Sequence, residues 1–380
     1  MKTFDVYPLF DIEPMKAQGS YIWDKNGTKY LDFYGGHAVI SIGHSHPYYI
    51  QKISEQLNKI GFYSNSVKIS LQDELAHKLG NLSGYEDYNL FLCNSGAEAN
   101  ENALKLASFT NGRKKIIAFD NSFHGRTSLA VAATDDKSIV APINENENIV
   151  FLPLNNEETL EKEMNEEVCA VIGEGIQGVG GIRIPTNSFL QKIKSLCTKF
   201  GSLMILDEVQ SGFGRTGKFF THQYSGVKPD LITVAKGMGN GFPIGGVLIS
   251  HEIKAKHGML GTTFGGNHLA CAAAIAVLDV IKNDNLIENS LEVGNYIMKS
   301  AQTIEGIKEV RGRGLMIGIE LEFICSSLRN ELLYKHKIFT GSSSNKNVIR
   351  ILPALNTSKT DADIFLDAFS KVLKSQKQTA

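Results

Sequence analysis

The sequence lacks several features that would place a chain in a specialised class. Its five cysteines are odd in number and include no Cys-x-x-Cys pair, so we expect reduced thiols rather than a disulfide framework or a zinc site. No sign of charge dominates, because 39 basic and 40 acidic residues give a net charge of -1. A global field that would attract nucleic acid or an anionic membrane is therefore not expected.

Long apolar stretches are also missing. The longest, residues 269–281, contains Asp279 and is shorter than the ~20 residues that a membrane span needs, so a buried helix is expected there. Asp5 and Pro8 interrupt the region where a signal peptide would need an unbroken apolar run. We therefore expect a cytoplasmic protein that binds small molecules and copies of itself, with no nucleic acid and no membrane as partners.

What is present is an alternation of apolar strand-like runs with helical patterns, which is typical of an α/β fold with a parallel sheet. The helical patterns cover residues 97–108 and 188–200. The 380 residues suggest two domains at ~150 residues each. We expect a large α/β domain over residues 46–283 and a small α+β domain made from residues 1–45 and 284–380. The expected strands are residues 90–93, 115–119, 168–173, 203–206, 231–235 and 246–250, with a hairpin over 20–32 and further strands at 316–321 and 348–352.

Two residues at expected strand ends suggest the chemistry. Asp207 follows one strand and Lys236 follows the next along the chain. A lysine amine can bond covalently to the aldehyde of pyridoxal phosphate, and a carboxylate facing the pyridine nitrogen keeps that nitrogen protonated, so that the ring draws electrons. Taken singly, such a lysine is more often a solvated surface residue and such an acid a turn.

Other expected strand ends carry groups that suit the same cofactor. Ser95, Gly96 and Ala97 open a helix, whose free N–H groups and positive dipole end suit a phosphate; an ordinary capping box of Ser95 with Glu98 is the alternative. Phe123 could stack on a flat ring and Arg126 could hold a carboxylate. Core packing and a surface ion pair are the alternatives for these two.

Taken together, these segments resemble the class III aminotransferases, pyridoxal phosphate enzymes of fold type I, over nearly the whole chain. This resemblance implies a large domain with a mostly parallel seven-stranded sheet flanked by helices. The motifs that carry it, in chain order, are Gly35-Gly36, Gly43-His44-Ser45-His46-Pro47, Asn94-Ser95-Gly96-Ala97-Glu98-Ala99-Asn100, Phe123-His124-Gly125-Arg126, Asp207-Glu208-Val209-Gln210-Ser211-Gly212, Ala235-Lys236-Gly237 and Gly261-Thr262-Thr263-Phe264-Gly265-Gly266-Asn267.

The resemblance also implies roles for individual residues. Lys236 would bind the cofactor covalently and move the proton, and Asp207 would pair with the pyridinium. The other implied cofactor contacts are Ser95, Gly96 and Ala97 at the phosphate, Phe123 on the ring face, Gln210 at the ring hydroxyl, Glu174, and Thr263 from a second subunit, which would make the active unit a homodimer. Arg126 would hold the carboxylate of the amino donor and Arg350 the α-carboxylate of glutamate; no metal is implied.

Within the class, the chain looks most like acetylornithine aminotransferases and their succinylornithine variant. Those enzymes move the δ-amino group of an acylated ornithine to 2-oxoglutarate, in arginine biosynthesis. One position departs from the pattern, because Val179 stands where relatives carry an acid that can mask the second arginine. We therefore expect Arg350 to be uncovered and to meet another anion, and we hypothesise that a succinyl group supplies it.

Other functions fit some of the same residues. The segment 212–218 has the glycine and lysine spacing of a phosphate-binding P-loop, but Phe219 stands where a hydroxyl should bind magnesium. Ornithine, 4-aminobutyrate and lysine aminotransferases share the cofactor residues and differ in the substrate pocket, to which Tyr63, Ser64 and Asn65 could contribute. A pyridoxal-binding gene regulator would need a DNA-binding module that the sequence does not show. The histidines at 37, 44, 46 and 124 lack metal-ligand spacing and are interpreted as structural.

Overall fold

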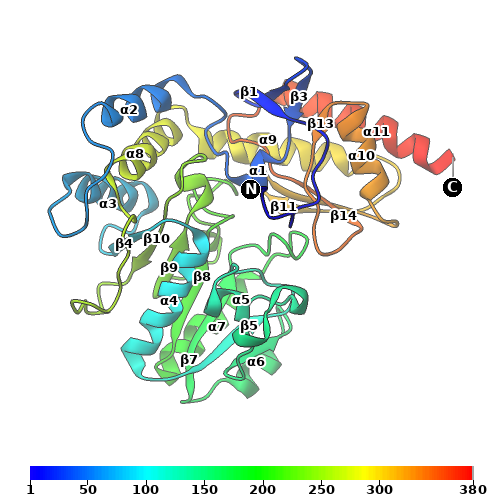
Figure 1. Ribbon diagram of the computed structural model, residues 1–380. Coiled ribbons are helices and arrows are strands. Elements are labelled where there is room, and N and C mark those ends of the chain that lie inside the picture. The colour runs from blue at the N-terminus through cyan, green and yellow to red at the C-terminus, as the bar shows by residue number, and fades with distance from the viewer. Residues whose placement is uncertain (379–380) are drawn as a thin grey trace.

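The computed structural model describes residues 1–378 and is built around a seven-stranded sheet (Figure 1). The strand order is β4-β10-β9-β8-β7-β5-β6, and β10 runs antiparallel to both of its neighbours while the other pairs are parallel. The prediction of a mostly parallel sheet is confirmed. The strands are β4 (Asn89–Cys93), β5 (Lys115–Phe119), β6 (Ile149–Leu152), β7 (Val168–Glu174), β8 (Leu203–Asp207), β9 (Leu231–Val234) and β10 (Gly245–Ile249).

Side chains of this sheet alternate between two apolar clusters, as the period of two in a strand requires. On β5, Ile116 and Ala118 pack with helix α4 (Gly96–Asn111), whereas Ile117 and Phe119 pack with helix α7 (Asn187–Phe200). Thr186 caps the start of α7 through the N–H of Phe189, and a left-handed glycine ends the helix. The sheet is therefore buried on both faces, which explains why its strands are continuous apolar runs.

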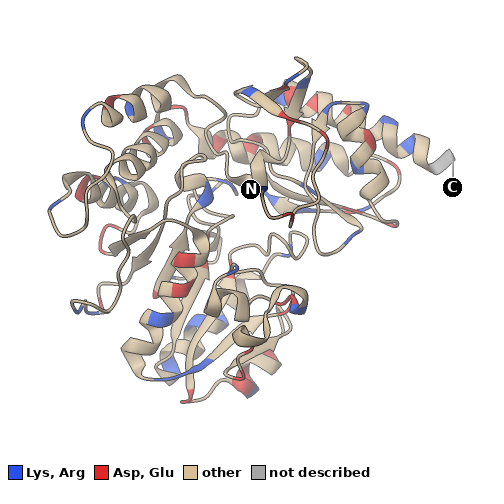
Figure 2. Cartoon of the chain, in the orientation of Figure 1, with Lys and Arg blue, Asp and Glu red and all other residues tan. Residues whose placement is uncertain are grey.

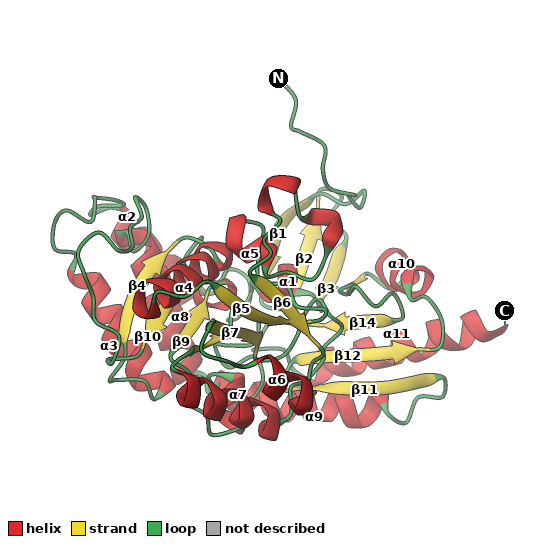
Figure 3. Ribbon diagram, turned by 90° about the horizontal axis from the view of Figure 1, so that it is seen from below, coloured by secondary structure: helices red, strands yellow, loops and turns green. Residues whose placement is uncertain are grey.

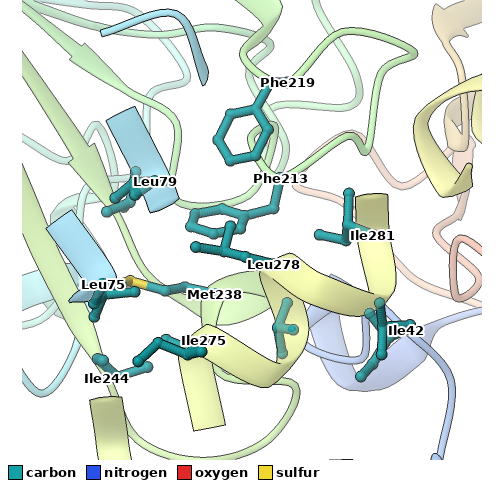
Figure 4. Close-up of a cluster of buried hydrophobic side chains, with 14 of the residues drawn as sticks. Ile42, Leu75, Leu79, Phe213, Phe219, Met238, Ile244, Ile275, Leu278 and Ile281 are labelled. Atoms are coloured by element: carbon teal, nitrogen blue, oxygen red, sulfur yellow. The ribbon is translucent and has the colours of Figure 1, made fainter. Parts of the chain in front are cut away.

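A third cluster lies beside β9 and β10, where helices α2 (Pro47–Leu57), α3 (Ser70–Ser83) and α8 (His268–Asn283) pack together. Figure 4 shows part of it, with Leu75, Met238 and Leu278 facing one another. The apolar run expected as a buried helix is α8, and its side chains are almost all buried. The short segment that begins at Lys236 contacts α8, so this cluster fixes the place of that lysine.

Two smaller sheets complete the chain, and one joins strands from opposite ends of the sequence. Its order is β1 (Pro14–Gln18), β2 (Tyr21–Asp24), β3 (Lys29–Asp32) and β13 (Ile338–Phe339), and β2 and β3 form the expected hairpin. The other has the order β11 (Ile307–Arg313), β12 (Met316–Leu321) and β14 (Val348–Ile351). Helices α9 (Leu286–Ala301), α10 (Ser326–Tyr334) and α11 (Lys359–Gln378) cover these sheets (Figure 1).

The remaining elements are short and lie on loops. They are α1 (Gly35–Ala38), α5 (Ser128–Ala132), α6 (Glu157–Glu163) and the 3-10 turns Lys137–Ile139, Pro142–Asn144, Thr221–Tyr224 and Lys236–Met238. The first residues of the chain extend away from the body, as Figure 3 shows. Positively and negatively charged residues are interspersed along the chain in both parts of the molecule (Figure 2). Within residues 1–378, no helix combines the length and apolarity needed to cross a membrane.

All six strands expected in the central sheet are present, and their ends coincide with the expected ones or differ by one residue. The edge strand β6 was not expected. The P-loop interpretation of residues 212–218 is wrong, because a P-loop opens an α-helix, whereas this segment leads to the 3-10 turn Thr221–Tyr224. Residues 212–216 of the segment are also buried, with Phe213 and Thr216 at 2% and 0% exposure, so they offer no open cradle for a nucleotide.

Candidate active site

A cavity of about 370 Å³ lies at the carboxyl ends of the parallel strands, where ligands collect in open α/β sheets. The loops after β4, β5, β7, β8 and β9 all reach it. Nine residues predicted for the site line it together: Ser95, Gly96, Ala97, Phe123, Arg126, Glu174, Asp207, Gln210 and Lys236. Val179 lines the same cavity.

Asp207 ends β8 and is held by a buried network. Its Oδ2 accepts hydrogen bonds from Asn100 Nδ2 at 2.7 Å and from His124 Nδ1 at 2.8 Å, and its Oδ1 accepts from the N–H of Val209 at 3.0 Å. Thr233 in turn donates to Asn100 Oδ1 at 2.7 Å. Buried polar atoms need such hydrogen-bond partners, and the network fixes the orientation of Asp207.

His124 and Asn100 were not assigned to the site from the sequence. His124 was interpreted as structural, yet it contacts Asp207 directly, 83 positions along the chain. Asn100 gives a weak signal in retrospect, since it is a polar residue on the buried side of α4 next to Ala99 and Ala103. The position of His124 in the sequence gives no such signal, because only the fold brings the ends of β5 and β8 close enough for the contact.

Lys236 occupies an unusual backbone conformation, with φ at 42°. Left-handed backbone is costly for a residue with a side chain, and such strain is concentrated at functional sites. Burial lowers the pKa of its ammonium group, and the charge of Arg350 lowers it further, while Asp207 and Glu174 act in the opposite direction. A lysine with a lowered pKa is more readily available as a neutral amine.

Glu174 ends β7 and joins two loops of the site. Its Oε1 accepts from the N–H of Phe123 at 3.0 Å and its Oε2 from the N–H of Gly178 at 2.9 Å. Burial raises the pKa of Glu174 to about 7 in spite of these hydrogen bonds, and the nearby charge of Asp207 adds to the increase. At neutral pH this side chain is therefore shared between its neutral and charged forms.

The N-terminus of α4 lies at another wall of the cavity. Ser95 caps the helix, with its Oγ accepting from the N–H of Glu98 at 3.2 Å, so the capping-box alternative describes part of its bonding. The N–H groups of Gly96 and Ala97 belong to the first turn and have no acceptor within the helix. A Cβ added to Gly96 would lie 2.6 Å from Val209 Cγ1, so a larger residue there would displace the loop beside Asp207.

The two arginines predicted to bind substrate differ in their surroundings. Arg126 is exposed at the cavity, whereas Arg350 on β14 is only 3% exposed. The side chain of Arg350 is bonded within the protein, but to neutral groups. Its Nε donates to the carbonyl of Ser342 and its Nη1 to Gln210 Oε1 at 3.4 Å. Both acceptors are neutral oxygens, and among residues 1–378 no carboxylate forms an ion pair with Arg350.

Four predicted residues lie outside the cavity of their own chain. Thr263, Tyr63 and Asn65 are exposed and Ser64 is half-buried, and none of the four is part of the lining. Asn65 instead donates to the carbonyls of Thr262 and Gly265 at 3.3 and 3.0 Å. The loops around residues 63 and 263 therefore form one surface.

The residues that line the cavity fit the chemical groups of pyridoxal phosphate. One cavity contains a lysine that suits the aldehyde of that group and a hydrogen-bonded carboxylate that suits its pyridine nitrogen. The same cavity contains an aromatic side chain that suits the ring and a helix N-terminus that suits the phosphate. The buried Nε2 of His124 has no hydrogen-bond partner among the described residues. Its Nδ1 is directed at Asp207. The fold and the site together define a pyridoxal phosphate-dependent transferase of fold type I.

Comparisons with known proteins agree. The family model described as aminotransferase class-III matches residues 5–373. An acetylornithine aminotransferase of Archaeoglobus fulgidus is 41% identical, covering 92% of each chain, and one of Bacillus cereus is 40% identical, covering 97% of each. The chain belongs to the class-III aminotransferases, and the prediction of a pyridoxal phosphate-dependent aminotransferase is confirmed.

Solved structures show the same architecture. The ornithine aminotransferase of Toxoplasma gondii superimposes with a TM-score of 0.92 at 26% identity, over 99% of this chain and 93% of that one. A second structure of that enzyme contains pyridoxal phosphate at partial occupancy in its active site. The expected fold type I is thereby confirmed.

Proposed function

We propose that this enzyme transfers the δ-amino group of an Nα-acylated ornithine to 2-oxoglutarate, giving the acylated glutamate semialdehyde and glutamate, as in arginine biosynthesis. The observation that carries the proposal is one cavity that contains Lys236, Asp207 and Arg126, with Arg350 against its wall through Gln210. The names of the relatives support the choice of donor, since those quoted above are acetylornithine aminotransferases.

The residues divide the work between binding and proton transfer. The chemistry that bound pyridoxal phosphate supplies is an aldehyde that takes up the amino group and a ring that draws electrons from the reacting carbon. Lys236 would take the proton from the reacting carbon as a base and afterwards give it up as an acid. Its lowered pKa favours the first step, because a neutral amine is needed to accept a proton.

Asp207 keeps the pyridine nitrogen protonated, and His124 and Asn100 hold it in place. In the proposal the N–H groups at Ser95, Gly96 and Ala97 bind the phosphate, Phe123 covers the ring, Gln210 bonds the ring hydroxyl and Glu174 holds the loops beside it. These roles are carried over from the family motif onto residues that line the same cavity.

Carboxylate recognition falls to the two arginines. In the proposal Arg126 binds the α-carboxylate of the donor by a two-pronged hydrogen bond, and Arg350 binds the α-carboxylate of glutamate. When glutamate binds, Arg350 would exchange its hydrogen bond to Gln210 Oε1 for one to the carboxylate of glutamate. Glutamate would then replace a weak neutral contact by a charged one.

The active unit in this proposal is a cytoplasmic homodimer in which Thr263 enters the cavity of the other subunit. Its exposure outside its own cavity supports this arrangement, and the neighbouring Phe264 is 60% exposed. The proposed domain division, 46–283 against 1–45 with 284–380, goes with it. Analytical ultracentrifugation and a Thr263→Ala variant, which should weaken cofactor retention without a change in fold, test the dimer.

A donor panel tests the reaction itself. The purified holoenzyme is mixed with acetylornithine, succinylornithine, ornithine, 4-aminobutyrate or lysine, and loss of the cofactor absorbance is followed. An acylated ornithine should react fastest, and Arg126→Gln should reduce its kcat/KM by roughly 10–100-fold. Faster reaction with free ornithine, 4-aminobutyrate or lysine would refute the proposal and name a different class-III enzyme.

A further inference from the structure

Glu208 is a buried acidic residue that lies between two residues of the cavity wall. Asp207 before it and Val209 after it both line the cavity, but Glu208 is not among the described residues of that lining. It is 0% exposed, so it contacts neither solvent nor a ligand in the cavity. A buried acid is costly unless other groups bond to it, so the partners of Glu208 indicate what it does.

The carboxylate of Glu208 ties together two turns that follow β8. Its Oε2 accepts a hydrogen bond from Ser211 Oγ at 2.6 Å and another from the N–H of Thr221 at 3.1 Å. Its Oε1 accepts from the N–H of His222 at 2.9 Å and from Nδ1 of the same residue at 2.8 Å. Both oxygens are thereby bonded, and the segment 207–212 is attached to the 3-10 turn that begins at Thr221.

His222 extends the connection to Tyr85, a residue between α3 and β4. Because a carboxylate oxygen only accepts, Nδ1 of His222 carries the hydrogen in its contact with Glu208. The other ring nitrogen, Nε2, lies 2.6 Å from the hydroxyl oxygen of Tyr85, and in the neutral ring this nitrogen accepts the hydroxyl hydrogen. His222 and Tyr85 are 0% and 4% exposed. The three side chains therefore form one buried chain of hydrogen bonds.

The backbone of Glu208 connects this chain to the network around Asp207. The N–H of Glu208 donates to the carbonyl of Thr233 at 3.0 Å. The hydroxyl of Thr233 donates to Asn100 Oδ1 at 2.7 Å, and Asn100 Nδ2 donates to Asp207 at 2.7 Å. Glu208 is therefore bonded on both sides of the turn that carries Asp207 and Gln210.

Close packing holds the chain at both of its ends. A Cβ built on Gly175 would lie 2.8 Å from Oε1 of Glu208, so the carboxylate fills the space that this glycine leaves. At the other end the ring of Tyr85 meets that of Phe220 edge-on at 5.8 Å, and the ring of Phe220 is stacked on His222 at 5.5 Å. Tyr85 and Phe220 belong to the apolar cluster beside β9 and β10.

We propose that Tyr85, His222 and Glu208 are positioning residues for pyridoxal phosphate. Their chain of hydrogen bonds holds the turn after β8 so that Asp207 and Gln210 face the pyridine nitrogen and the ring hydroxyl. The inference rests on the cofactor contacts in the proposed function and is independent of the identity of the amino donor. In this assignment none of the three side chains touches the cofactor, and each acts through the turn.

Breaking this chain at a single hydroxyl should weaken cofactor binding. Tyr85→Phe keeps the ring and leaves Nε2 of His222 buried without its donor. The turn that carries Asp207 then has more freedom in the cofactor-free protein, and cofactor binding must restrict it. We expect the dissociation constant of pyridoxal phosphate to rise roughly tenfold.

Tyr88→Phe is the matched control. The hydroxyl of Tyr88 donates to the carbonyl of Pro229 at 2.6 Å, and its ring meets that of Tyr85 edge-on at 4.7 Å. The control therefore loses a tyrosine hydrogen bond next to the chain but outside it. Both variants should unfold at a lower urea concentration, but only Tyr85→Phe should bind the cofactor more weakly. This comparison separates positioning from a general loss of stability.

A second variant breaks the same hydrogen bond from its other side. In His222→Asn the shorter side chain keeps an amide that can donate to Glu208 but does not reach Tyr85. Its effect on cofactor binding should equal that of Tyr85→Phe. The double variant should bind the cofactor no more weakly than either single variant, because one hydrogen bond is removed only once. Additive losses would show that the two residues act separately and would overturn the chain.

Cofactor retention is measured on the holoenzyme by equilibrium dialysis at several concentrations of pyridoxal phosphate, and steady-state kinetics follow with the cofactor saturating. For Tyr85→Phe we expect a lower kcat at unchanged KM values for glutamate and the amino donor, because the hydroxyl contacts no substrate. An unchanged dissociation constant, an equal increase in Tyr88→Phe, or a kinetic change confined to KM would contradict the assignment.

Failure of this inference and failure of the proposed function give different results. If Tyr85→Phe retains the cofactor as well as the unmodified enzyme does, the positioning chain is overturned, and the donor panel still decides the reaction. If no acylated ornithine reacts, the proposed reaction is refuted, while the dissociation constants still decide whether the chain holds the turn after β8.

Discussion

Glu174 should make the stability of the protein depend on pH in a predictable direction. Its pKa in the folded state is about 7 because the side chain is buried, whereas its ordinary value is 4.5. Below pH 4.5 both the folded and unfolded forms carry the proton, so no penalty arises. As the pH rises toward 7 the unfolded chain ionises first, and the folded state loses stability relative to it.

The size of the loss follows from the two pKa values. Their separation corresponds to about 3 kcal/mol once the pH exceeds both of them. The side chain is only 8% exposed, so solvent screens the effect little. Glu174→Gln removes the titration, although it also places an amide against one of the two N–H donors, Phe123 or Gly178, which lowers stability at every pH by about 1–3 kcal/mol.

The measurement compares urea unfolding of the two cofactor-free proteins at several pH values between 4.5 and 8. The free energy of unfolding of the unmodified protein minus that of Glu174→Gln should fall by about 3 kcal/mol over this range. Glu166→Gln, the same change at an exposed position, should show no such trend. A difference that stays constant with pH, or grows, would refute the argument that burial controls this carboxyl.

Other changes have equally definite outcomes. Lys236→Ala should abolish transamination, and borohydride reduction followed by peptide mapping should find the pyridoxyl group on Lys236 of the unmodified enzyme; an adduct elsewhere would disprove the assignment. Asp207→Ala leaves the donors of Asn100 and His124 without an acceptor and should cost roughly 3–5 kcal/mol of stability, with weaker cofactor retention in equilibrium dialysis; full retention would contradict the role. Arg350→Gln should raise the KM for glutamate by roughly 10–100-fold, and an unchanged KM in steady-state kinetics would exclude it from glutamate binding. Leu75→Ala, at a position with 0% exposure, should cost roughly 2–5 kcal/mol in urea unfolding and leave the cofactor spectrum unchanged; a cost below 1 kcal/mol would mean that the cluster relaxes around the cavity.

The sequence predicted the central sheet well because its strands are buried on both faces and form unbroken apolar runs. The edge strand β6 escaped notice, since it has four residues and only Leu152 is fully buried. The antiparallel direction of β10 was equally invisible, because a strand pattern carries no direction. Both features depend on the neighbours that the fold supplies.

The candidate site was predicted from residues at strand ends, which is where the fold brings them together. The contacts between distant positions could not be predicted in this way. His124 was interpreted as structural although it bonds to Asp207, and the contacts of Arg350 with Ser342 and Gln210 were not expected. Such contacts depend on packing geometry rather than on residue type or spacing.

The pairing of β3 with β13 has a consequence for the order in which the chain is made. Strands β1 to β3 emerge from the ribosome near the start of synthesis, but the partner of β3 follows roughly 300 residues later, which at ~5–20 residues per second means some tens of seconds. Until then Leu31 and Phe33 lack the C-terminal side chains that enclose them. The apolar side chains of the N-terminal hairpin therefore stay exposed during most of translation. A truncation that removed only the last fifth of the protein would leave them exposed permanently.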